Sequence, residues 1–164
     1  PGPPWPARAH PPQRNARPAP GGRTATPADW MLLAGDDTGL PAMLRIAAAL
    51  PAHTRGHVFA EVQGPQDEQP VQAPEGLQWH WLHRGAAEAG TTTLLIDALR
   101  AVEWPVPSPG ASPSSRFVWA AGEFDTAQAV RQWAREERGL EKHEQLVVAY
   151  WRRGMSESDF KAAK

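Results

Sequence analysis

The sequence predicts an α/β domain: one parallel sheet of about five strands with helices on both faces. Short apolar runs alternate with amphipathic stretches, and this alternation continues from residue 29 to residue 154. Strands that are joined through helices need right-handed crossovers, so they lie parallel and are covered on both faces. Three layers, helix, sheet and helix, are therefore expected.

The first strand and helix form the clearest pair. The apolar run at residues 30–34 ends at Gly35, as a strand buried on both faces would. A short turn leads into a helix over residues 40–50, whose apolar side chains recur at spacings of three and four. Pro41 suits the first helical turn, and Pro51 ends the helix.

The same alternation repeats along the rest of the domain. Further strands are expected over residues 57–62, 77–82, 117–121 and 146–151, and a second helix over residues 91–102. Asp125, with Gln128 three residues on, resembles a capping box that would begin the third helix. Gly139 would end that helix at the C′ position.

Residues 1–28 differ in composition from the rest of the chain. They hold nine of the 18 prolines and four arginines without an acid, so they carry +4 and leave −5 for the remainder, given the net charge of −1. We expect a disordered or polyproline-like leader, either a solvated tail or a segment that binds an acidic partner or an aromatic groove. The folded domain then covers residues 29–154, and residues 155–164 form a C-terminal tail that could hold a short helix.

Composition excludes several classes of function. The 164 residues contain no cysteine, which excludes disulfides, thiolate nucleophiles and cysteine-ligated metals and fits a cytoplasmic setting. No apolar run approaches the roughly 20 residues that span a bilayer, and the net charge gives no argument for nucleic-acid binding. His80 and His83 would point to opposite faces of a strand, so no metal site is expected. No nucleophile-elbow pattern suggests a hydrolase.

In open parallel sheets, ligands bind outside the carboxyl ends of the strands. The first segment expected at this edge is Gly-Asp-Asp-Thr-Gly-Leu-Pro, residues 35–41. Gly39 would let the backbone approach a ligand, the amides at the helix start suit a pyrophosphate, and Thr38 adds a hydroxyl donor. Because the segment is neither a GxGxxG motif nor a Walker loop, an ordinary strand-to-helix turn remains an alternative.

The second segment at this edge is Trp-Ala-Ala-Gly-Glu, residues 119–123. Small residues and Gly122 would leave room for a flat ring against the backbone. Glu123 either lies near that ring or is simply an acid that caps the next helix.

The third segment, residues 149–154, combines two aromatic side chains with Arg152 and Arg153. Such a group can stack on rings and hold phosphates or carboxylates, or the arginines are merely solvated. Arg84, after the third strand, is a candidate for the ribose side of a nucleotide, where an arginine would favour NADP over NAD.

At these three segments the sequence resembles the C-terminal domain of the siderophore-interacting proteins, which are NAD(P)H-dependent ferric-siderophore reductases. The matching runs are residues 33–42, 119–123 and 150–154, within a resemblance that covers about residues 29–160. More distantly, the pattern is similar to the nucleotide domain of ferredoxin–NADP reductases. The first turn reads Asp-Thr-Gly where the family often has Glu-Thr-Ala.

The resemblance implies that NADPH or NADH lies over the strand ends and passes hydride to FAD, which then reduces Fe(III) in a siderophore. It assigns the phosphates to main-chain amides of Thr38, Gly39 and Leu40, and the nicotinamide and flavin side to Gly122, Glu123 and Trp151. The full set of implied cofactor-binding residues is Gly35, Asp36, Thr38, Gly39, Leu40, Arg84, Ala121, Gly122, Glu123, Trp151 and Arg152.

The family's flavin domain is a β-barrel that precedes this domain, and here the Pro/Arg-rich leader stands in its place. The sequence begins with Pro1 rather than Met, which is consistent with a fragment of a longer protein. Two functions stay open: an oxidoreductase whose flavin domain was lost or lies on a separate chain, and a catalytically silent nucleotide-binding or interaction module. A parallel-sheet domain of another kind, such as a methyltransferase, is a third alternative.

Overall fold

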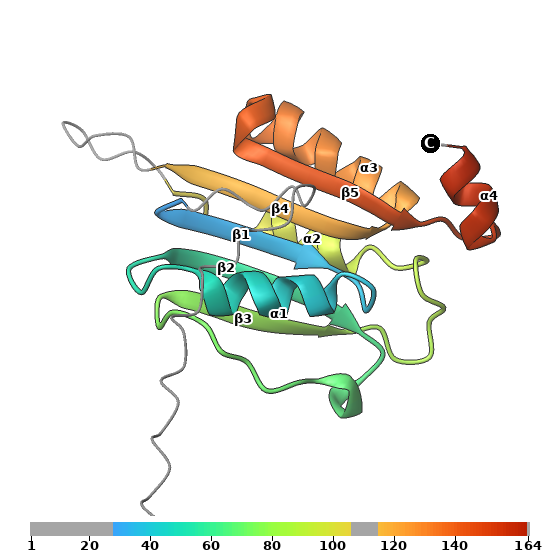
Figure 1. Ribbon diagram of the computed structural model, residues 1–164, viewed down its shortest axis with the longest axis horizontal. Coiled ribbons are helices and arrows are strands. Elements are labelled where there is room, and N and C mark those ends of the chain that lie inside the picture. Colours follow the sequence, from blue (N-terminus) through green and yellow to red (C-terminus); the bar gives the residue numbers. More distant parts are fainter. Residues whose placement is uncertain (1–27, 106–114, 164) are drawn as a thin grey trace, which may run out of the picture.

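The computed structural model describes residues 28–105 and 115–163, and five of its strands form one sheet (Figure 1). The sheet order is β3-β2-β1-β4-β5, and every neighbouring pair of strands is parallel. The strands are β1 Trp30–Gly35, β2 Arg55–Val62, β3 Leu77–His83, β4 Arg116–Glu123 and β5 Gln145–Trp151. The predicted α/β class with an all-parallel sheet is confirmed.

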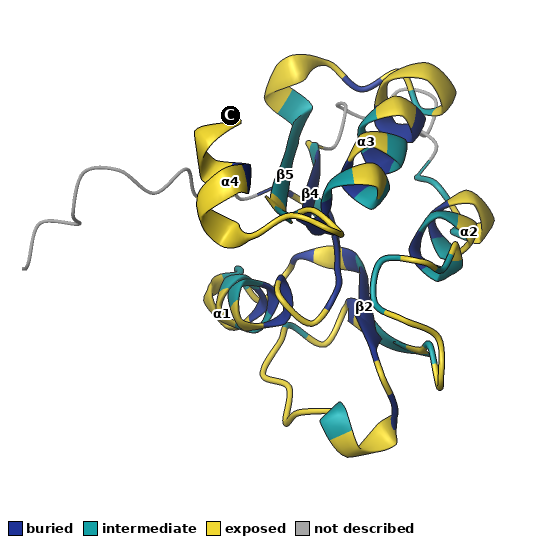
Figure 2. Ribbon diagram, turned by 90° about the vertical axis from the view of Figure 1, so that its right-hand side faces the viewer, coloured by how far each residue is buried: buried dark blue, intermediate teal, exposed yellow. Residues whose placement is uncertain are grey.

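Helices lie on both faces of this sheet. They are α1 Leu40–Ala49, α2 Leu94–Ala101, α3 Phe124–Gln132 and α4 Glu157–Ala162. Helix α1 covers one face, and α2 and α3 cover the other (Figure 2). No helix in the described part of the chain is long and apolar enough to cross a membrane.

The core has two halves because successive side chains of a strand point to opposite faces. In β1, Met31 and Leu33 pack with α1, whereas Leu32 and Ala34 pack with α2 and α3. All four side chains are buried, as expected for a central strand of a parallel sheet. The buried indole of Trp133 belongs to the second half.

Two helix starts differ from the prediction. Helix α2 begins at Leu94 instead of residue 91, because Thr91 turns back and donates to the carbonyl oxygen of Glu88. Helix α3 begins at Phe124 with Glu123 as its N-cap, so the capping box predicted at Asp125 is wrong. The predicted end of the third helix is confirmed: a π turn continues α3, and Gly139 follows it with a φ of +63°.

The leader predicted for residues 1–28 lies outside the described residues, except for Ala28, which is buried against the α1 side of the core. Residues 106–114, between α2 and β4, also lie outside them. A short helix, α4, lies in the segment that follows residue 154.

Gly56 in β2 is the position where the sheet is least tolerant of a side chain. Its φ is +133°, and a Cβ there would lie 1.9 Å from the carbonyl oxygen of Met31 in β1. Gly56→Ala should therefore lower the free energy of unfolding by roughly 3 kcal/mol or more. Gly85→Ala is the control: its φ is also positive, nothing lies within 4 Å, and about 1 kcal/mol is expected. Equal losses in urea denaturation of the two variants would contradict this account.

Candidate functional site

The candidate site lies at the carboxyl edge of the sheet, where all five strand arrows end on the same side (Figure 1). The chain runs from β1 outward to β3 and then returns to β4 on the other side of β1. Strands β1 and β4 therefore flank the point where the strand order reverses, which is where ligands bind in such sheets. The predicted segments at residues 35–41 and 119–123 meet there.

The first turn and the end of β4 are in close contact. A Cβ on Gly35 would lie 2.6 Å from the carbonyl oxygen of Ala121, and a Cβ on Gly39 would lie 2.7 Å from the same atom. The absence of a side chain at Gly39 is thus explained by packing against β4. The sequence-based explanation, close approach to a ligand, is not needed for this glycine.

The carboxylate of Asp36 connects three segments of chain. Its Oδ2 accepts hydrogen bonds from the amide of Glu123 and from the indole Nε1 of Trp151, each at 2.9 Å. Its Oδ1 accepts from the amide of Thr38 at 2.9 Å and from the hydroxyl of Thr38 at 2.5 Å. Asp36 is only 6% exposed, so these four donors replace its water. A Cβ on Gly122 would lie 2.7 Å from Oδ2.

These bonds involve the donors of the phosphate site predicted in the first turn. The amides of Gly39 and Leu40 donate to the carbonyl oxygen of Asp36, at 2.9 and 3.1 Å, and the donors of Thr38 go to its carboxylate. All the donors that the prediction assigned to a pyrophosphate therefore have partners inside the turn. The side chain of Leu40 is buried in the core. The buried carboxylate already satisfies the N–H groups that an external anion would need.

Glu123 is a buried capping acid, which was one of the two roles left open by the sequence. Its Oε2 accepts from the amides of Asp125 and Thr126 at 2.6 and 3.2 Å, and its Oε1 accepts from the amide of Arg153 at 3.2 Å. The residue is 1% exposed. Its charge therefore faces the start of α3 and the chain after β5, while its backbone remains at the strand end.

Arg84 pairs with an acid of the first turn. Its Nη2 lies 2.7 Å from Oδ2 of Asp37, and its side chain is 10% exposed. Its Nη1 is buried without a partner among the described residues. Asp37 offsets the positive charge of Arg84, so Arg84 is a weaker candidate for binding the 2′-phosphate of NADP.

A third buried acid, Glu61, lies near the end of β2. It is 4% exposed and accepts a hydrogen bond from the hydroxyl of Thr92 at 2.8 Å. Burial raises the pKa of Glu61, and this outweighs the lowering by the Thr92 hydroxyl and the charge of Arg84. Asp36, Glu61 and Glu123 thus form a row of buried carboxyl groups below the carboxyl edge.

In the third predicted segment, residues 149–154, the side chains of Trp151 and Arg152 contact different parts of the structure. Trp151 lies over the site, held by Asp36, and Gly90 packs against both Trp151 and Glu123. The guanidinium of Arg152 lies 4.6 Å from the ring centroid of Phe124, at the start of α3. Trp151 therefore joins the residues around Asp36, whereas the side chain of Arg152 is directed toward α3.

An open cavity of about 320 Å³ lies beside this edge, between the starts of α2 and α3. Its lining includes Thr91, Thr92, Thr93, Asp125, Thr126 and Arg153. Helix α2 has no side-chain cap at its N-terminus, so its first-turn N–H groups lack the side-chain acceptor that α3 has in Glu123. The three threonines were missed because they were read as part of a helix. Three consecutive β-branched hydroxyl residues before an apolar helix were the available signal.

The histidines within the described residues pair with each other or with acids. Nδ1 of His57 and Nε2 of His80 lie 3.0 Å apart, and Nε2 of His83 lies 2.8 Å from an oxygen of Glu68. The rings of His57 and His80 are also stacked, with centroids 5.3 Å apart and planes inclined by 26°. Within residues 28–105 and 115–163, no group of three or more potential metal ligands is found.

Comparison with known proteins identifies the family. The family model described as siderophore-interacting protein matches residues 28–154, most of the chain. This chain belongs to the siderophore-interacting protein family. The predicted family resemblance is therefore confirmed.

Three relatives illustrate the match. A Mycobacterium tuberculosis protein is 36% identical over 98% of this chain and 58% of its own length, and the ferric vibriobactin reductase ViuB of Vibrio cholerae is 33% identical over 82% and 47%. The crystal structure of a siderophore utilization protein from T. fusca has a TM-score of 0.72 and 40% identity, over 80% of this chain and 48% of that one. The chain spans about half the length of the relatives it matches.

Asp36→Ala should destabilise the fold by about 3 kcal/mol, since it leaves several buried donors without an acceptor. The control is Asp125→Ala, which removes an exposed acid from the start of α3 and should cost less than about 1 kcal/mol. Urea denaturation followed by tryptophan fluorescence measures both. If the two variants are equally stable, the connecting role of Asp36 is wrong.

Glu61→Gln should gain stability relative to the wild type as the pH rises. A carboxyl group whose pKa is raised by folding stabilises the protein most below its unfolded pKa, and this contribution is lost as the pH rises through the folded value. Glutamine keeps an acceptor for Thr92 and does not titrate. Melting temperatures between pH 4 and pH 8 should diverge in favour of the variant, whereas Glu75→Gln, at an exposed position, should follow the wild type. Parallel curves for Glu61→Gln would contradict the assignment.

Proposed function

We propose that this chain binds NADPH or NADH along the carboxyl edge of its sheet, as the nucleotide-binding part of a flavin-dependent ferric-siderophore reductase. The observation that carries the proposal is the open cavity at the α2 and α3 starts, next to the point where the strand order reverses, in a chain of this family. The ferric vibriobactin reductase among the relatives supports the reaction class.

The phosphates of the nucleotide would lie at the start of α2 and not in the first turn. The amides of the first turn are bonded to Asp36, whereas α2 lacks a side-chain cap. Thr91 and Thr93 line the cavity there, with their hydroxyls donating to the carbonyl oxygen of Glu88 and the carboxylate of Asp97, and Arg153 supplies a cation on the side that also holds Asp125. Uncapped helix N–H groups together with a guanidinium favour a phosphate.

The nicotinamide ring would lie against the backbone of Gly122 and Glu123, beside the indole of Trp151. Asp36 fixes both sides of this place, through the amide of Glu123 and the indole nitrogen. Gly122 and Glu123 are buried, and the carboxylates of Asp36 and Glu123 are directed inward, so the surface offered to the ring is the partly exposed indole of Trp151 above this strand end. The bound nucleotide supplies the hydride, and these residues orient its ring.

The FAD that the family uses would contact this chain beyond Trp151. Tyr150 and Met155, on either side of the chain's exit from β5, are exposed large apolar side chains, 42% and 40% accessible. Apolar side chains of this kind fit the edge of an isoalloxazine ring or the domain that carries it. A flavin domain on the same or another chain, and a ferric siderophore as the final electron acceptor, complete the proposal.

The alternative function is a nucleotide-binding module without catalysis. Adding NADPH and FAD to the purified chain distinguishes the two, because flavin reduction under anaerobic conditions appears as loss of absorbance near 450 nm. Nucleotide binding without that loss favours the module.

Arg153→Gln should weaken NADPH binding about tenfold, the effect of losing one charge-assisted contact. Its backbone amide, which donates to Glu123, is kept, so the melting temperature should not change. Arg55→Gln, an exposed arginine at the opposite end of β2, should bind NADPH like the wild type. Titration of protein fluorescence measures both variants, and unchanged affinity in Arg153→Gln would overturn the phosphate position.

A further inference from the structure

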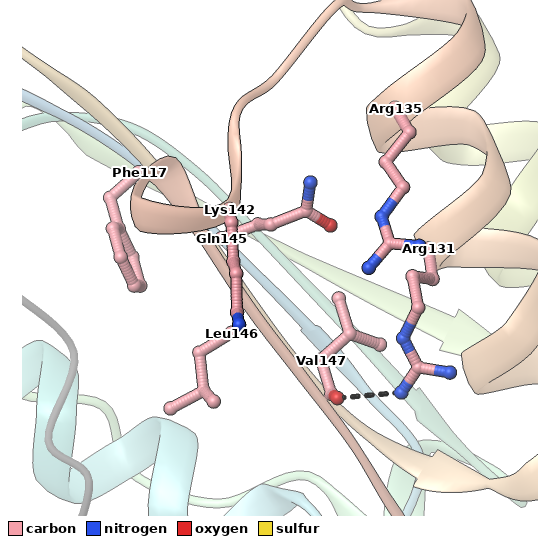
Figure 3. A pocket seen from close by; sticks show the side chains of 7 residues that line it. All are labelled: Phe117, Arg131, Arg135, Lys142, Gln145, Leu146 and Val147. Carbon is pink, nitrogen blue, oxygen red and sulfur yellow. Dashed lines mark hydrogen bonds between the residues drawn. The ribbon is translucent and has the colours of Figure 1, made fainter.

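A second cavity, of about 300 Å³, lies beside the first half of β5. It is lined by Arg131, Arg135, Lys142 and Gln145, with Leu146 and Val147 as part of an apolar lining (Figure 3). A strand advances about 3.3 Å per residue, so Gln145 lies roughly 20 Å from Trp151 at the other end of β5. This cavity is therefore separate from the proposed nucleotide site.

The charge of the cavity is uniformly positive: three cationic side chains line it and no acidic one does. Arg131 donates from Nη2 to the carbonyl oxygen of Val147 at 2.9 Å, which fixes its guanidinium beside the strand. Arg135 and Lys142 have no side-chain partner in the part of the chain that the structure describes. Two of the three cations are thus available to a ligand.

The acids nearest in sequence already have other partners. Glu144 accepts from Nε of Arg116 at 3.1 Å and from the amide of Glu141 at 2.9 Å. A carboxylate oxygen of Glu141 lies 3.4 Å from Nδ1 of His143, and Glu136 accepts from Gln132 at 2.8 Å. Among the described residues, none of these carboxylates forms an ion pair with a cation that lines the cavity.

The backbone at this cavity departs from α-helical geometry. Helix α3 passes into a π turn at Trp133–Glu137, in which the amide of Arg138 donates to the carbonyl oxygen of Trp133. Such turns are rare and recur at functional sites. Arg131 and Arg135 extend from this helix toward the strand that carries Val147 (Figure 3).

We propose that this cavity binds a compact ligand with two or more oxyanion groups, either phosphates or carboxylates. Guanidinium groups bind both kinds of oxyanion through paired N–H donors, and the ammonium of Lys142 adds a point charge. The apolar lining accepts the carbon or bridging part of such a ligand. Nothing in the reductase reaction requires this site, so it would serve a second ligand.

Calorimetric titration of the 164-residue chain with sodium pyrophosphate and with sodium citrate, at constant ionic strength, tests the proposal. Saturable binding of at least one anion is expected. Binding of pyrophosphate alone identifies phosphate chemistry, binding of citrate alone identifies carboxylate chemistry, and binding of both identifies a general polyanion site.

The double variant Arg135→Gln with Lys142→Gln should weaken this binding about tenfold or more, since it removes two charge-assisted contacts. Arg45→Gln, an exposed arginine of α1, is the matched control and should bind the anion like the wild type. The proposal fails if neither anion binds saturably, or if Arg45→Gln weakens binding as much as the double variant. It also fails if Arg153→Gln alone weakens binding, because the anion would then occupy the nucleotide site.

Discussion

The arrangement of the carboxyl edge depends on the carboxylate of Asp36. It joins the first turn to the end of β4 through Glu123 and to the end of β5 through Trp151, at sequence separations of 87 and 115 residues. A buried carboxylate is costly unless donors replace its water, and here four donors do so. Gly122 leaves the space that this carboxylate occupies. The crevice between β1 and β4 is consequently filled by protein.

An anion that belongs to the chain changes where a foreign anion can bind. In the first turn, Asp36 takes the position that a phosphate would take at a helix start, because the nearby N–H groups already donate to it. Glu123 does the same at the start of α3. Among α1, α2 and α3, only α2 has no internal carboxylate that accepts from an N–H group at its start or in the turn before it. The place at this edge where an external anion could bind is therefore the start of α2, at Thr91–Thr93, together with Arg153.

The sequence predicted the fold better than the site, for a physical reason. Apolar runs such as residues 30–34 report burial on both faces, which is a local property, and the parallel direction of the strands follows from general rules of chain crossover. The partners of Asp36 and the cap at Glu123 depend on contacts between distant segments, which no local pattern encodes. The family motifs singled out residues that lie together in the fold, since Gly35, Asp36, Gly122, Glu123 and Trp151 do meet. The motifs did not reveal that the carboxylates of Asp36 and Glu123 are directed into the protein.

The row of buried acids at Asp36, Glu61 and Glu123 is compatible with a negatively charged nucleotide because each acid is directed to an internal donor. Backbone amides hold Glu123, and a hydroxyl holds Glu61, so neither carboxylate faces the cavity, whose polar lining consists of the three threonines, Asp125, Thr126 and Arg153. At the other end of β5 the charges are positive. Three cations line an open cavity there, and Glu144 nearby is paired with Arg116. The two ends of one strand thus use the same rule, that only a charge without an internal partner is available to a ligand.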